Sequence, residues 1–224
     1  MKECPVIFNG EMVRAILDGR KTQTRRIMKV QPESPGFGLR FITESLNSRD
    51  AGKYFWSQSD ACGINKPRSK PFACQFGQVG DRLWVRETFA AFDADWKHPG
   101  KPHDLKDGPW PNVVYPASVA KIPDGTCRPS IHMPRWASRI LLEITAVRVE
   151  RLNDISEEDA RAEGISDGGC LNCGEPEPCG CANPQPDATD AFAYLWQSIY
   201  GVENWLTNPW VWVIEFKRVE AQHG

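Results

Sequence analysis

The sequence lacks several features that would assign the chain to a class at once. Among its 224 residues, no apolar run approaches the roughly 18 that a membrane span needs. Its first residues, MKECPVIFNGEMVRA, hold too short an apolar stretch for a signal peptide. There is no glycine-rich phosphate loop, no internal repeat and no regular alternation of strands and helices. We therefore expect a cytoplasmic protein with no membrane partner.

An excess of positive charge is also missing. The 27 Lys and Arg residues face 29 Asp and Glu residues, which gives a net charge of −2. Proteins that coat DNA draw their affinity from strongly basic surfaces, so we expect no tight non-specific DNA binding. The charge still allows a local basic pocket. The chain is long enough to bury a core without a disulfide scaffold, and its hydrophobic fraction of 41% is ordinary.

The four histidines show no spacing typical of metal ligands, whereas four of the cysteines cluster as a metal site would, although their spacing departs from that of common structural zinc sites. Four of the eight follow the pattern C-x2-C-x5-C-x-C in a loop rich in Gly and Pro. Such a group of thiolates can bind zinc tetrahedrally, and we predict a structural zinc ion that catalysis does not require. The alternative is a loop of redox-sensitive thiols. The four residues are Cys170, Cys173, Cys179 and Cys181.

Hydrophobic periodicity predicts the main elements. A first strand at 4–8 is followed by a helix that Asn9 caps and Gly19 ends. The alternation in the strand at 139–152 slips near Thr145 and Ala146, which predicts a β-bulge in a curved strand. Further strands are expected at 83–89, 113–115 and 210–216, and further helices at 156–163 and from Asp187 or Thr189 to Gly201.

Segments rich in Pro, Gly and charge interrupt this order at 31–78, 93–128 and 166–188, and we interpret them as insertions. The remaining strands and helices predict an α+β fold, with a small mixed β-barrel and flanking helices in a single domain over residues 1–224.

One motif has the character of a family signature. The segment ILDGRKTQTRR at 16–26 resembles that of the ASCH family, which belongs to the PUA-like superfamily of small β-barrels. Three further segments are similar to that family: GDRLWVRE at 80–87, the helix at 156–164 and VIEF at 213–216. The tryptophan-rich segments and Pro134-Arg135-Trp136 resemble its longer, phage or prophage type. The resemblance implies a PUA-like barrel and an association with RNA.

The resemblance also implies an activity. A small bacterial ASCH protein is an amidohydrolase that removes the acetyl group from N4-acetylcytidine, and the residues implicated there fall by motif on Lys21, Thr24 and Glu163. We therefore expect these three residues to line one pocket and to act on an N4-acylated cytidine or a related modified base. The alternatives are a non-catalytic RNA-binding module and a ribonuclease.

Amide hydrolysis needs a nucleophile, a proton acceptor and a stabiliser for the developing oxyanion. A lysine amine becomes a base when burial and neighbouring cations lower its pKa. Three arginines, Arg20, Arg25 and Arg26, supply such cations and would also attract a substrate carbonyl. Thr24 would either attack the carbonyl or hold its oxygen. The alternative is a solvated basic strand without a catalytic role.

Three residues of the strand at 83–89 form a second candidate group. We predict that Trp84, Arg86 and Glu87 contact the substrate near the mouth of the barrel. The alternative is that they form the salt-bridged outer face of a strand.

Overall fold

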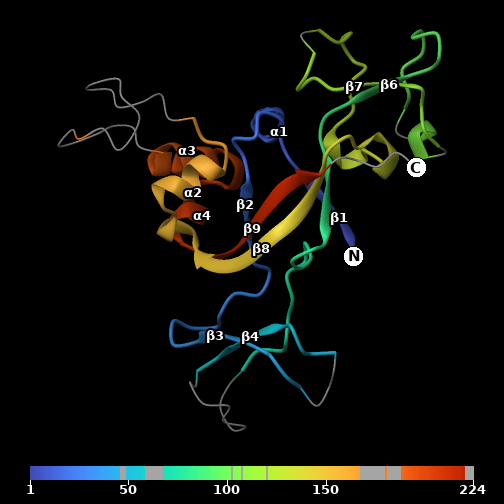
Figure 1. Ribbon diagram of the computed structural model, residues 1–224. Coiled ribbons are helices and arrows are strands. Elements are labelled where there is room, and N and C mark those ends of the chain that lie inside the picture. The colour runs from blue at the N-terminus through green and yellow to red at the C-terminus, as the bar shows by residue number, and fades with distance from the viewer. Residues whose placement is uncertain are drawn as a thin grey trace.

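A mixed five-stranded sheet forms the centre of the computed structural model, which describes residues 1–45, 49–58, 68–101, 103–106, 108–119, 121–166, 180 and 188–219 (Figure 1). In spatial order its strands are β1 (Glu3–Ile7), β5 (Arg82–Arg86), β8 (Leu141–Arg151), β9 (Trp210–Val219) and β2 (Gln23–Ile27). Strands β1 and β5 run parallel, and the other neighbours are antiparallel. The α+β class is confirmed. The ladder of described residues is open, with β1 and β2 at its edges, so the closed barrel stays a prediction.

The bulge predicted in the long strand is present. Ile144 pairs with Phe216, whereas Ala146 pairs with Glu215, and the register shifts between these two pairs. An extra residue in one strand bends it and increases its twist. Figure 1 shows β8 and β9 as long curved strands whose lower ends lie beside the helices α2 and α4.

Helix α1 (Gly10–Leu17) leads into the basic motif (residues 16–26) and packs against the sheet. The Asn9 side chain caps it by accepting a hydrogen bond from the backbone N–H of Met12 at 2.8 Å. Its buried residues Val13 and Ile16 belong to the main hydrophobic core of the sheet. The chain then turns at Gly19, whose φ of +77° is in the left-handed region that favours glycine. The buried start of β2 follows directly.

Three helices pack beside β8 and β9: α2 (Glu157–Ala162), α3 (Ala188–Tyr200) and α4 (Val202–Leu206) (Figure 1). The Ser156 hydroxyl caps α2, and the Glu157 carboxylate accepts hydrogen bonds at 3.0 Å from the first two backbone N–H groups of α3. Phe192 and Trp196 of α3 are buried in a second core cluster with residues of β9. Glu157, at the start of α2, thus connects this helix to the start of α3.

The first insertion contains strands that the sequence did not predict, and the second contains one that it did. The segment at 31–78 includes the hairpin β3 (Gly38–Phe41) and β4 (Tyr54–Ser57), where Trp56 is buried 5.2 Å from the ring of Trp210. The predicted strand at 113–115 is β7 (Asn112–Val114), which pairs with β6 (Ala90–Phe92). Short 3-10 turns complete the fold: η1 (Asp104–Lys106), η2 (Ser130–His132), η3 (Arg135–Ala137) and η4 (Leu152–Asp154). No helix in the described ranges has the length and apolar character to span a membrane.

Candidate functional site

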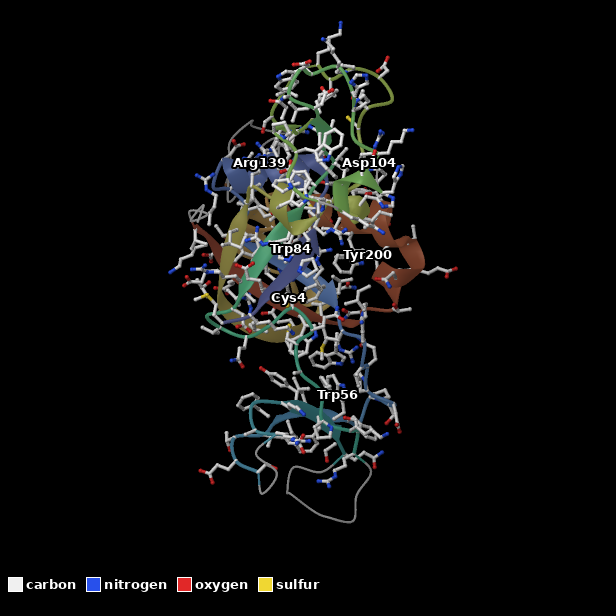
Figure 2. The ribbon with its side chains drawn as sticks, turned by 90° about the vertical axis from the view of Figure 1, so that its right-hand side faces the viewer. Cys4, Trp56, Trp84, Asp104, Arg139 and Tyr200 are labelled. Carbon is white, nitrogen blue, oxygen red and sulfur yellow. The ribbon has the colours of Figure 1, made fainter. Side chains whose placement is uncertain are left out.

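A pocket of about 200 Å³ opens between the start of β2 and helix α3. Figure 2 labels Tyr200 on the helix that forms one of its walls. Polar residues from the basic motif and from the end of α2 form one side, and apolar residues of α3 form the other. The lining residues are Ile7, Asn9, Met12, Thr24, Arg25, Arg26, Glu163, Phe192, Leu195, Trp196, Ile199 and Tyr200.

Beside the pocket, an ion pair joins the basic motif to the end of α2. The Lys21 ammonium lies 2.6 Å from Oε2 of Glu163 and donates a second hydrogen bond, at 2.7 Å, to the backbone oxygen of the same residue. Lys21 and Glu163 also form an isolated β-bridge, and Thr22 N–H bonds to the backbone oxygen of Ala162. These contacts attach the end of α2 to the edge of the sheet at β2.

Lys21 lies behind Glu163 rather than in the pocket. Its side chain is 0% exposed, and it is absent from the lining of the pocket, whereas Thr24 and Glu163 are part of that lining. Burial lowers the pKa of the Lys21 amine, the charge and hydrogen bond of Glu163 oppose this, and the charges of Arg26 and Arg25 lower it further. The net direction is downward. The sequence predicts that all three residues line one pocket. In the structure Thr24 and Glu163 line it, whereas Lys21 contacts Glu163 from behind and does not.

Glu163 and Arg25 each hold an unsatisfied polar atom beside the pocket. Oε1 of Glu163 and Nη1 of Arg25 are buried and have no hydrogen-bond partner among the described residues, although they lie 3.5 Å apart as charges. Buried polar groups are almost always hydrogen-bonded, so this ion pair at 3.5 Å leaves hydrogen-bonding capacity unused beside the pocket. The result is one acceptor and one donor, side by side, in two residues that line the pocket.

Thr24 and the arginines of the motif differ in their access. Thr24 is buried, lines the pocket, and its hydroxyl makes no hydrogen bond within the described ranges. Arg26 also lines the pocket, donates to the backbone oxygen of Ile7 at 2.8 Å and stacks over Phe8. Arg20 lies outside it, exposed, with hydrogen bonds to Gly164 and Ser166. The solvated basic strand considered from the sequence is therefore wrong for positions 21 and 23–25, which are buried.

The second candidate group lies away from the pocket. Glu87 is buried, and its two carboxylate oxygens accept hydrogen bonds from Nε and Nη2 of Arg139 at 2.9 and 3.0 Å. This is the salt bridge of the alternative interpretation. Trp84 lies on β5 with the guanidinium of Arg86 5.5 Å and that of Arg135 6.0 Å from its ring (Figure 2). None of these residues lines the pocket.

The apolar wall of the pocket was not predicted as part of a site. The sequence pattern predicts the stripe of α3 as core, and Phe192 and Trp196 are indeed buried. However, Ile199 and Tyr200 at the end of the same stripe remain 47% and 36% exposed. The apolar face of α3 extends beyond the core that it covers, and this was the signal in the sequence that could have indicated a ligand-binding surface.

The carboxylate of Asp159 responds to pH. Burial raises its pKa, but hydrogen bonds from Arg25 and Arg148, and their charges, lower it more, so the net pKa is below its usual value. The folded state then binds the proton less tightly than the unfolded chain, whose pKa is about 4. Its stabilisation is complete above that pKa and is lost as the pH falls through the lower folded value.

We accordingly expect Asp159→Asn to lower the free energy of unfolding at pH 7 by about 1.5–3 kcal/mol, the usual worth of hydrogen bonds to a charged group. The deficit should narrow as the pH falls below about 4, where wild-type Asp159 also becomes protonated. Urea denaturation of both proteins at pH 7 and at low pH measures this. A deficit that stays constant across that range would contradict the assigned shift.

Gly164 controls the approach of α2 to the basic motif. It has a φ of +88°, and an added Cβ would lie 2.8 Å from Cβ of Ala15 and 3.0 Å from Cβ of Lys21. Gly164→Ala should therefore destabilise the protein by about 1–3 kcal/mol of overpacking beyond its backbone cost. Gly19→Ala is the control, because its φ is +77° with no atom within 4 Å, leaving a backbone cost of about 1–2 kcal/mol. Equal losses in thermal denaturation would contradict a close contact at Gly164.

The four cysteines predicted to bind zinc, Cys170, Cys173, Cys179 and Cys181, lie outside the described residues. Within the ranges that are described, no group of three or more His, Cys, Asp or Glu side chains could hold a metal ion. The zinc site stays a prediction, and metal analysis of protein purified without chelator tests it.

Comparison with models of protein families, with curated proteins and with solved structures gives no match. The features that indicate a function are the geometry of the pocket and the motif of residues 16–26.

Proposed function

We propose that this protein is an amidohydrolase that removes an acyl group from the exocyclic amine of a nucleobase, with N4-acylated cytidine or a related modified base as its substrate. The observation that carries the proposal is the pair of unsatisfied atoms, Oε1 of Glu163 and Nη1 of Arg25. A secondary amide presents one N–H donor and one carbonyl acceptor. It therefore offers a partner to each of the two atoms.

The shape of the pocket supports a substrate with a flat ring. Phe192, Trp196 and Tyr200 of α3 line the pocket, and Tyr200, at 36% exposed, presents the most accessible ring of the three. Aromatic side chains stack favourably on nucleobases, which every base allows because each has a π face. At about 200 Å³ the pocket is smaller than the roughly 300–1,000 Å³ typical of sites for drug-sized ligands. It suits one base and a short acyl group rather than several nucleotides.

In the proposed reaction Glu163 is the general base. Its Oε1 takes a proton from water, the water oxygen attacks the acyl carbon, and the C–N bond breaks as the leaving amine receives the proton. Arg25 stabilises the negative charge that develops on the carbonyl oxygen. Lys21 holds the other carboxylate oxygen through Oε2 and so orients Glu163. The products are a free carboxylic acid and the unmodified base.

In this scheme the Thr24 hydroxyl donates a hydrogen bond to the oxygen of the attacked carbonyl group. A threonine nucleophile needs a base hydrogen-bonded to its hydroxyl, and no described residue makes that bond. Water activated by Glu163 therefore fits the geometry better than a covalent intermediate on Thr24. The ASCH resemblance and its PUA-like barrel belong to the same proposal.

The experiment is an incubation of the protein with N4-acetylcytidine, followed by product analysis. We expect cytidine and acetate in equal amounts. Absence of turnover with any acylated cytidine, together with binding of RNA, would replace the enzyme by a binding module. Shortening of an RNA oligomer would indicate a ribonuclease instead.

One observation favours the RNA-binding module as a second candidate. Trp84 with the guanidinium groups of Arg86 and Arg135 combines a stacking surface with positive charge. Arg86 is in register with Ile7, one of the residues that line the pocket, so the two candidate groups are connected through the pair of strands β1 and β5. Binding of RNA by such contacts is strongly salt-dependent and releases no product.

A further inference from the structure

The carboxylates that hold Arg25 are themselves held by a second guanidinium. Nη2 of Arg25 donates to Asp159 at 2.7 Å and to Glu150 at 2.9 Å. Arg148 on β8 binds both of these carboxylates, with Nη2 at 2.9 Å from each oxygen of Asp159 and Nε on Glu150. Two arginines thus share two carboxylates.

Arg148 is fixed from further sides as well. Its Nη1 pairs with Glu215 on β9, and Oε1 of Gln23 on β2 accepts from its Nη2 at 3.4 Å. Gln23 also donates to the backbone oxygen of Asp159 at 3.0 Å. Arg148 therefore joins β8, β9, β2 and α2 in one hydrogen-bonded network.

The orientation of Arg25 depends on this network. Its side chain is 0% exposed, and its Nε and Nη1 make no hydrogen bond with a described residue. The hydrogen bonds of Nη2 to Asp159 and Glu150 consequently set the plane of the guanidinium, and with it the direction of Nη1 toward Glu163 and the pocket. If either carboxylate moves, Nη1 moves too.

We propose that Arg148 and Asp159 are positioning residues, which hold Arg25 in the orientation that stabilises the oxyanion. Arg148 does not line the pocket and acts through Asp159 and Glu150. The inference rests on the proposed amidohydrolase function. A small displacement of a catalytic group is costly, because a shift of about 1 Å can reduce the rate by about a hundredfold.

The test is a double-mutant cycle of Arg148→Gln and Arg25→Gln, assayed with N4-acetylcytidine. Arg148→Gln should lower kcat by about ten- to a hundredfold with little change in KM, since the contact of Arg25 with the carbonyl oxygen is strongest once negative charge has developed in the transition state. In the background of Arg25→Gln the same substitution should have almost no further effect. A structural role for Arg148 would instead lower activity by the same factor in both backgrounds, and that additivity would overturn the inference.

Arg161→Gln is the matched control. Arg161 lies on α2 like Asp159, its side chain is 32% exposed against 31% for Arg148, and it pairs with Glu157 rather than with the pocket residues. We expect its kcat to stay within about twofold of wild type. Arg148→Lys should recover part of the activity, because a lysine restores the charge but not the forked geometry of the guanidinium.

Ligand affinity separates failure of this inference from failure of the proposed function. Binding of N4-acetylcytidine is measured by tryptophan fluorescence for the same set of variants. If the wild-type protein binds this ligand without turnover, the proposed hydrolysis is wrong, and the positioning role that rests on it is wrong as well. If it neither binds nor hydrolyses the ligand, both proposals fail. Turnover by wild type with additive losses in the cycle contradicts the positioning role alone.

Discussion

Replacing Glu163 with Gln is expected to lower kcat for an N4-acylated cytidine by about 10²–10⁴-fold, the usual loss on removing a positioned general base. Glutamine keeps the shape of the side chain but cannot accept the proton of the attacking water. Its carbonyl oxygen can still accept a hydrogen bond from Lys21, which in the wild type bonds Oε2 at 2.6 Å. Steady-state kinetics with N4-acetylcytidine measure the effect.

Glu143→Gln is the control for that variant, because Glu143 pairs with Lys217 on the sheet and does not line the pocket. Its kcat should match that of the wild type. A loss of less than about tenfold in Glu163→Gln would show that this carboxylate binds or orients groups rather than transferring the proton.

Replacing Lys21 with Met is expected to give the largest loss of stability. The Glu163 carboxylate, 4% exposed, would then lose the partner of Oε2 inside the protein. Breaking a buried ion pair by removing one member costs about 3–5 kcal/mol, and Glu163 would keep only the longer contact of its Oε1 with Arg25 at 3.5 Å. Equilibrium urea denaturation at pH 7 measures the free energy of unfolding.

The double variant Lys21→Met/Glu163→Gln distinguishes the charge from the packing. It leaves no charge without its partner, so we expect it to recover most of the stability that the single variant loses. Equal destabilisation of the single and double variants would attribute the loss to the packing of the lysine chain, for example against Phe8, whose ring centroid lies 5.5 Å from Nζ.

The elements that local patterns determine were predictable from the sequence. The Asn9 cap, the helix that begins after Ser156 and the bulge near Ala146 each depend on neighbouring residues, and the structure has all three. The hairpin β3–β4 was missed because Pro, Gly and Ser around it indicate a loop. The aromatic run at 54–57 was the contrary signal, and its rings pack on Trp210 and Trp212.

The candidate site was predictable only in part. The motif places Lys21 and Thr24 in the site, but their positions alone do not show that Lys21 lies behind Glu163. The contacts of Arg25 with Glu150 and Asp159 join residues 125 and 134 positions apart, so no local pattern indicates them. The charges of the motif predict exposure, whereas the structure buries Lys21 and Arg25, because each finds carboxylate partners at α2 or on β8.

The structure of Glu163→Gln with bound N4-acetylcytidine tests the central claim most directly, since this variant should bind the substrate without consuming it. We predict that the ring stacks against Tyr200, the exposed ring of α3 in the pocket wall, with the acyl oxygen within hydrogen-bond distance of the Arg25 guanidinium and the amide nitrogen facing residue 163. A ligand bound on the surface of Trp84, or an empty pocket at saturating ligand, would contradict the assignment of this pocket as the site of amide hydrolysis.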